Sequence, residues 1–170
     1  MHLEEDELRQ VTLYAATCAR RVLPVFEAGH PDDPRPRDAI AAAEAFATGR
    51  KRTAALRTAA WSAYTAAREA EEAPAANAAY AASHAAAAAF LHPLATPHQV
   101  KHVLGAAVHQ ALALELDTAN NSDAGRESLD WAATLASPAV RRVLCRLPSP
   151  RRGRGRFGEL LHDLDTELRR

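Results

Sequence analysis

The chain has 170 residues, enough for one domain, and its 21 basic and 21 acidic residues give a formal net charge of zero at pH 7. This balance excludes a global field that would attract nucleic acid or a membrane surface. Alanine dominates the 48% hydrophobic fraction, aromatic residues make up only 5%, and Ile40 is the only isoleucine. Because alanine is the strongest helix former and β-branched residues favour strands, the composition predicts an all-α fold.

In chain order, apolar residues at three- and four-residue spacing predict a first helix over residues 4–27. A proline-rich loop leads to a second helix that stops near residue 49, and a third starts around residue 53 with Tyr64 on its apolar face. Pro74 separates a fourth helix, and residues 98–116 form the clearest one. A sixth helix passes through Trp131, and a short helix begins at Pro138 with Ser137 as its N-cap.

We expect about seven helices in one domain, arranged as a multi-helix bundle or a short stack of helical hairpins. Residues 1–147 form the main helical domain, 148–156 a flexible basic loop, and 157–170 an amphipathic helix that packs on the same domain. The arginines of the loop are typical of nucleic-acid-binding tails, but no aromatic residues lie among them, which favours a solvated linker.

Neither the cysteines nor the hydrophobic segments indicate export or membrane insertion. Cys18 and Cys145 lie in separate apolar segments and form no CxxC pair, which favours reduced thiols. The N-terminal residues lack the apolar stretch of a signal peptide, and no segment reaches the roughly 20 large apolar residues that span a bilayer. We therefore expect a cytoplasmic protein without membrane contact.

Three histidines of the 98–116 helix project to one side. His98, His102 and His109 lie within roughly 40° of one another on a helix of 3.6 residues per turn, opposite the apolar stripe. The first two have the i, i+4 spacing of metal ligands, but the glutamate of an HExxH motif and an acidic partner helix are missing. We expect a solvated or partner-facing strip and no metal. His84, in contrast, shares a stripe with Tyr80 and is expected to point inward.

A basic cluster surrounds the start of the third helix, opposed to the helix dipole. It consists of Arg50, Lys51, Arg52 and Arg57. Three interpretations remain open for it: surface salt bridges with carboxylates such as Asp32, Asp33 or Glu44, acidic groups on a partner protein, or phosphate and nucleic acid.

Catalytic signatures are missing from the sequence. There is no phosphate-binding glycine loop, no GxSxG elbow and no pair of ExxH helices. Asp32 and Asp33 are adjacent carboxylates, but turn and capping preferences explain them in a proline-rich turn. We expect no catalytic residues and no cofactor.

Two stretches of the sequence are distinctive. One is LPVFEAGHPDDPRPRDAIAAAEAFATG with the basic RKRTAALRTAAWSAYTAAREA that follows, and the other is AAYAASHAAAAAFLHPLATPHQVKHVLGAAVHQALALE. Together they resemble the immunity-protein-five-like family, which is common in actinobacteria. The similarity covers roughly residues 8–116, and HPDDPRPRDAI is its most distinctive piece. The resemblance implies an all-helical cytoplasmic protein that binds and neutralises a cognate protein toxin of a polymorphic toxin system. It assigns no catalytic residues.

An immunity protein needs a rigid surface complementary to its toxin, often with opposite charge. The residues expected to contribute to such a surface are Asp32, Asp33, Arg35, Arg50, Lys51, Arg52, Arg57, His98, His102 and His109. Two other functions stay open: a small ligand-binding domain or enzyme that uses the His and Asp residues near the proline-containing loops, and a nucleic-acid-associated regulator. A homodimer through an alanine-rich face is compatible with all three.

Overall fold

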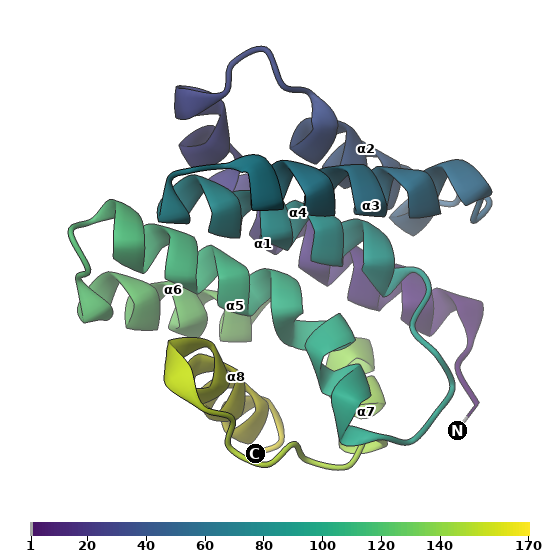
Figure 1. Ribbon diagram of the computed structural model, residues 1–170. Helices are drawn as coiled ribbons and strands as arrows, with labels where there is room; N and C mark the ends of the chain where they lie inside the picture. The colour runs from purple at the N-terminus through teal and green to yellow at the C-terminus, as the bar shows by residue number, and fades with distance from the viewer. Residues whose placement is uncertain (1) are drawn as a thin grey trace.

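The computed structural model describes residues 2–170, which form eight α-helices, a short 3-10 helix and no strand (Figure 1). The expected all-α fold is confirmed, with one helix more than the approximate number expected. The elements are α1 (Glu5–Gly29), α2 (Arg35–Ala47), α3 (Ala54–Glu69), α4 (Ala73–Ala88), η1 (Pro97–Gln99), α5 (Val100–Asp117), α6 (Ser122–Leu135), α7 (Pro138–Cys145) and α8 (Gly155–Leu168).

Helices α1, α4 and α5 form the centre of the bundle. Helix α4 contacts α1, α2, α3 and α5, whereas α5 also contacts α6, α7 and α8. Figure 1 shows α2 and α3 on one side of this centre and α6, α7 and α8 on the other. Most alanines of α4 are buried, and their small side chains let neighbouring helices approach closely. The alanine-rich face of α4 is therefore covered inside the monomer.

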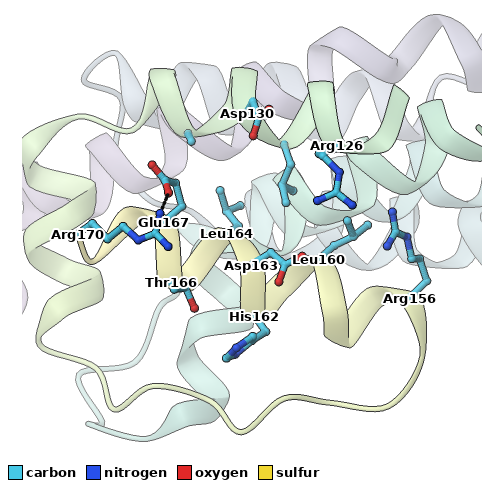
Figure 2. Close-up of a pocket in the computed structure, with 12 residues that line it drawn as sticks. Arg126, Asp130, Arg156, Leu160, His162, Asp163, Leu164, Thr166, Glu167 and Arg170 are labelled. Atoms are coloured by element: carbon cyan, nitrogen blue, oxygen red, sulfur yellow. Dashed lines mark hydrogen bonds and ion pairs between the residues drawn. The ribbon is translucent and has the colours of Figure 1, made fainter. Parts of the chain in front are cut away.

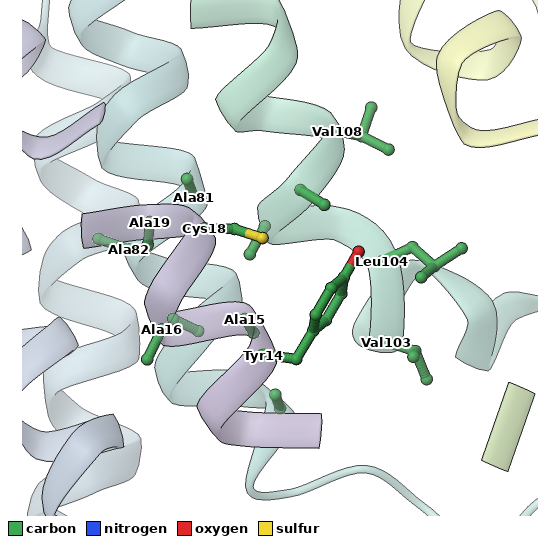
Figure 3. Packing of buried hydrophobic residues seen from close by; sticks show 14 of the residues in the cluster. Tyr14, Ala15, Ala16, Cys18, Ala19, Ala81, Ala82, Val103, Leu104 and Val108 are labelled. Carbon is green, nitrogen blue, oxygen red and sulfur yellow. The ribbon is translucent and has the colours of Figure 1, made fainter. Parts of the chain in front are cut away.

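The core between α1 and α5 holds a tyrosine and a cysteine. Figure 3 shows Tyr14 and Cys18 of α1 with their side chains directed toward α5, among residues that include Leu104 and Val108. Tyr14 is 4% exposed, and its hydroxyl has no hydrogen-bond partner within residues 2–170. Burial raises the pKa of the Cys18 thiol to about 12, so this thiol stays protonated at neutral pH. Cys18 is thus a core residue and not a nucleophile.

The helix starts follow from local chemistry. The side chain of Ser137 accepts a hydrogen bond from the backbone N–H of Val140 at 3.4 Å, which confirms it as the N-cap of α7. Thr53 caps α3 in the same way through the N–H of Leu56. In residues 2–170 no helix is both long and apolar enough to cross a membrane.

Helix α8 packs against α5, α6 and α7. It begins at Gly155, so Arg156 lies in its first turn and not in the preceding loop. The Arg156 guanidinium pairs with Glu115 of α5 at 2.9 Å, which ties α8 to the centre of the bundle. At Gly158 the helix passes so close to Gly153 that a Cβ atom would lie 2.5 Å from the backbone carbonyl carbon of Gly153.

Candidate partner-binding surface

Helix α3 carries a stripe of large side chains beside its buried face. Leu56, Ala60 and Ala63 are buried, and α3 packs against α2 and α4. At i, i+4 and i+7 from residue 57, Arg57, Trp61 and Tyr64 share the adjoining side. Trp61 is 65% exposed and Tyr64 is 38% exposed, so both rings remain accessible to a partner.

The stripe borders a hollow of about 620 Å³ between α3, the C-terminal half of α4 and the beginning of α5. We call it the aromatic hollow. Its lining consists of aromatic rings, histidines, one arginine and small residues, with no carboxylate among them. The lining residues are Arg57, Ala60, Trp61, Tyr64, Ser83, His84, Ala87, Phe90, His92 and His102.

Ring contacts connect the rim of the hollow to the interior. Trp61 meets Tyr64 edge to face with ring centroids 5.7 Å apart, and Tyr64 meets Tyr80 of α4 in the same manner at 5.6 Å. Below them, Ser83 donates a hydrogen bond of 2.9 Å to the carbonyl oxygen of Ala60, which fixes α4 against α3. The aromatic rim therefore stands on a rigid two-helix support.

His84 forms part of the floor. Its ring fits against Gly105 of α5, where a Cβ atom would lie 2.6 Å from the His84 Nδ1 atom. Burial, followed by the nearby His102 and Lys101, lowers the pKa of His84 to about 4, so the ring is neutral at pH 7. The expectation that His84 points inward agrees with this position.

The expected outward strip of three histidines is wrong for His109. Its ring stacks on Tyr80 and on His84, both at 5.2 Å, and lies 4.9 Å from Phe157 of α8. Its Nδ1 atom lies 2.9 Å from Oδ1 of Asn77. Burial and the neighbouring His84 lower its pKa to about 3. Helix α8 covers this side of α5, which the periodicity of α5 alone does not reveal.

His98 and His102 remain together near the hollow. Their rings meet edge to face at 5.6 Å, with His98 exposed on η1 and His102 half-buried in the lining. Burial, and then the nearby His98, His92 and Lys101, lower the pKa of His102. Among residues 2–170, no three His, Cys, Asp or Glu side chains converge in a way that could hold a metal ion.

Two arginines flank Phe90, which lies just after the end of α4. The guanidinium of Arg57 lies 4.5 Å from the ring centroid and that of Arg52 lies 5.5 Å from it. Arg52 also donates a hydrogen bond of 2.9 Å to the carbonyl oxygen of Ala89. These contacts hold both guanidinium groups beside the hollow, where cation–π attraction supports them.

The basic cluster forms no salt bridge with the carboxylates that the sequence offered. Glu44 pairs with Arg20 at 2.6 Å, and Asp33 pairs with Arg35 at 2.6 Å. Within residues 2–170, no ion pair involves the four cations of the cluster, which are Arg50, Lys51, Arg52 and Arg57. The surface-salt-bridge interpretation of the cluster is therefore wrong.

The acidic loop before α2 lies apart from the hollow. Asp33 accepts hydrogen bonds from the Arg35 side chain. These bonds are the main reason why the pKa of the Asp33 carboxyl group is lowered. Arg35 also pairs with Glu69 at the end of α3 at 2.7 Å, while Asp32 is exposed. None of these residues lines the hollow, so the structure does not bring Asp32 or Asp33 together with His84 or His92.

A second, smaller pocket of about 330 Å³ lies between α6 and α8. Figure 2 shows charged side chains from both helices around Leu160 and Leu164, with Arg170 paired to Glu167. Three arginines and three carboxylates line it, which are Arg126, Arg156, Arg170, Asp130, Asp163 and Glu167. Because these charges offset one another, the pocket shows no preference for either sign of charge.

The fold and the hollow define a small all-α protein whose most distinctive exposed feature is an aromatic surface on a rigid support. Residues 1–138 match the sequence model of the family described as Imm-5 like putative immunity protein, and the chain belongs to this family. The resemblance inferred from the sequence is thereby confirmed. Comparison with the curated proteins and with the solved structures finds no match. The aromatic hollow lies wholly within the matched residues, whereas α8 lies outside them.

Sequence reasoning missed the aromatic rim. It placed Tyr64 on the apolar face with Leu56, whereas Tyr64 lies beside that face and is half-exposed, and it gave no role to Trp61. One signal was present in the sequence: in a chain with 5% aromatic residues, Arg57, Trp61 and Tyr64 recur at helical spacing. The partner across the hollow, Phe90, becomes visible only when α4 is placed against α3.

Proposed function

We propose that this protein is an immunity protein that binds and neutralises a cognate protein toxin by direct contact, without catalysis, in the cytoplasm. The toxin contact lies on the aromatic hollow. Membership in the family supports the general role. The single observation that supports this location is the 65% exposure of Trp61 on the rim of a preformed hollow.

The chemistry of the rim suits a protein interface. Tryptophan, tyrosine and arginine are the residues most enriched at binding hot spots, and the rim combines Trp61, Tyr64 and Arg57. Their side chains are anchored by ring contacts and by the underlying helices, so binding orders few additional rotamers. An exposed tryptophan ring that becomes covered by a partner contributes apolar burial at the centre of the contact.

The other residues expected at the interface fall into three groups. The residues at or beside the hollow belong to the proposed contact, and they are Arg52, Arg57, His98 and His102. His109 acts from behind it by supporting Tyr80. The loop with Asp32, Asp33 and Arg35 and the flanking Arg50 and Lys51 form further surface that a large toxin would reach, and they remain a secondary part of the proposal.

A co-expression assay tests the proposal. Toxin domains encoded near the gene are expressed in a host with this protein, and growth is recorded. We expect rescue by the wild-type protein and loss of rescue by Trp61→Ala, because truncation removes the central anchor. Leu13→Ala is the matched control, since Leu13 is an exposed apolar residue on α1 that does not line the hollow.

Circular dichroism of both variants verifies that they fold. No rescue by the wild-type protein against any of these toxins contradicts the immunity function. Rescue by Trp61→Ala at the wild-type level contradicts the location.

One observation favours a second function, a ligand-binding domain. The hollow has the size of small-molecule sites, and His84, His92 and His102 supply convergent polar groups. Native mass spectrometry of the protein purified from its own organism tests this: a retained small molecule that is lost in Ala87→Phe, which fills the hollow from a partly exposed position, would support ligand binding, and a mass equal to that of the bare chain would oppose it.

A further inference from the structure

The elements that build the aromatic hollow contain almost no negative charge. Residues 49–68, which include all of α3 except its last residue, Glu69, contain five basic residues and no Asp or Glu. Residues 73–114, which include α4 and most of α5, also contain no Asp or Glu and carry Lys101. Because the whole chain is neutral, its carboxylates are concentrated elsewhere. The hollow therefore presents a locally positive surface on a neutral protein.

The two guanidinium groups beside the hollow keep donors free for a partner. Arg57 contacts the Phe90 ring and forms no ion pair within residues 2–170, and Arg52 uses one nitrogen on the carbonyl oxygen of Ala89. Each guanidinium carries five N–H donors in a planar fork that matches a carboxylate. Both are thus positioned by Phe90 and remain available for charge-assisted hydrogen bonds.

We propose that the aromatic hollow receives an acidic segment of the partner protein, with an apolar side chain seated among Trp61, Tyr64 and Phe90 and carboxylates on Arg52 and Arg57. This inference rests on the proposed function for the identity of the partner as a toxin. The charge of the hollow comes from its arginines, because burial keeps His84 neutral at pH 7. His102 adds polar ring nitrogen atoms beside these cations.

The geometry favours a protein segment over a nucleic acid. A nucleic-acid strand needs a track of cations for successive phosphates, whereas the long α4–α5 segment contributes only Lys101. Base stacking needs open ring faces side by side, but Trp61 and Tyr64 meet at an interplanar angle of 82°.

The test uses Trp61 as the reporter. The chain has two tryptophans, so Trp131→Phe leaves Trp61 alone. This variant is titrated with a short peptide in which glutamates flank a central Leu–Phe pair. The comparison peptide has glutamine in place of every glutamate. We expect a saturable change in Trp61 fluorescence with the acidic peptide, weakened by added salt, and binding of the glutamine peptide that is at least about tenfold weaker.

Charge variants in the Trp131→Phe background assign the effect to the arginines. Arg52→Gln with Arg57→Gln is expected to raise the Kd of the acidic peptide at least about tenfold. Arg126→Gln, an exposed arginine on α6 outside the hollow, is the matched control and is expected to leave the Kd unchanged. A single-stranded oligonucleotide is titrated in parallel, and we expect no saturable response.

Each other result overturns the inference. Equal affinity for the two peptides, no saturable response to the acidic one, an unchanged Kd in the arginine double variant, or tighter binding of the oligonucleotide would exclude an acidic protein segment as the occupant. The peptide titration needs no toxin, so it is independent of the growth assay. Rescue from toxin with a failed titration would leave the immunity function standing and remove only the acidic occupant.

Discussion

At the scale of single residues, the hydroxyl of Tyr14 is a polar group in an apolar core. The ring lies between α1 and α5 (Figure 3), and the hydroxyl has no hydrogen-bond partner among the residues that the structure describes. Burying such a group without a partner costs roughly 1–3 kcal/mol. The same burial raises the pKa of Tyr14 well above its usual value. This side chain therefore reduces the stability of the fold while its ring fills the core.

Tyr14→Phe is expected to raise the free energy of unfolding by about 1 kcal/mol, because it removes the unpaired hydroxyl and keeps the ring. Urea denaturation followed by circular dichroism measures this change. A shift of the thermal midpoint upward by roughly 2–4 °C would accompany it for a chain of this size. Destabilisation by a similar amount would show that the hydroxyl is bonded in solution, for example to a buried water.

Two partly buried histidines make stability depend on pH. An unfolded histidine binds its proton near pH 6.5, whereas His84 and His109 do so near pH 4 and pH 3 when folded. Between these values the unfolded state binds more protons, so the stability that is complete above pH 6.5 declines as the pH falls through this window. The expected slope approaches roughly 1.4 kcal/mol per pH unit for each histidine.

His109→Phe is expected to reduce this slope by up to roughly 1.4 kcal/mol per pH unit, because it removes one of the histidines whose pKa burial lowers and keeps a ring between Tyr80 and Phe157. Urea unfolding between pH 7 and pH 4.5 measures the slope. A slope in His109→Phe equal to that of the wild-type protein would mean that His109 is not held neutral by burial.

At the scale of elements, α8 is held at one close crossing. A Cβ atom at Gly158 would meet the backbone of Gly153, which has no flexible end that could move away. Gly158→Ala is expected to lower the free energy of unfolding by about 2 kcal/mol and to raise hydrogen exchange in α8. Gly29→Ala is the control, since nothing lies within 4 Å of its Cβ position. Equal stability of the two variants would contradict the tight crossing.

The elements show which parts of the structure were accessible from sequence. Helix starts at Thr53 and Ser137 were predictable because a capping side chain satisfies nearby backbone donors. The environment of His109 was not, because the covering residue, Phe157, is distant in sequence and belongs to another helix. The face of Tyr64 was misjudged since one residue of rotation moves a side chain about 100° around a helix.

The candidate site was only partly predictable for the same reason. The basic cluster and His102 were predicted as contact residues from composition and spacing, and Arg57 and His102 line the hollow. The hollow itself depends on how α3, α4 and α5 are placed, and no local pattern encodes that placement. The tertiary structure also decides which charges pair. Glu44 pairs with Arg20 and Asp33 pairs with Arg35, so neither carboxylate is available to the basic cluster around the start of α3.

At the scale of the whole molecule, charge is neutral in sum and uneven in distribution. The two segments that form the aromatic hollow lack carboxylates, while α1 begins with three acidic residues, Glu5, Asp6 and Glu7. Such an arrangement orients the molecule toward a partner of opposite charge without a large net charge. The proposed role thus combines a rigid helical support, an aromatic anchor and cations that determine which partner docks.

The affinity of the purified pair tests the central claim most directly. The toxin domain neutralised in the growth assay is titrated by calorimetry with the wild-type protein, Trp61→Ala and Leu13→Ala. We predict that Trp61→Ala raises the Kd at least about tenfold, while Leu13→Ala changes it by less than about twofold. The same Kd for Trp61→Ala and the wild-type protein would contradict the aromatic hollow as the toxin-binding site.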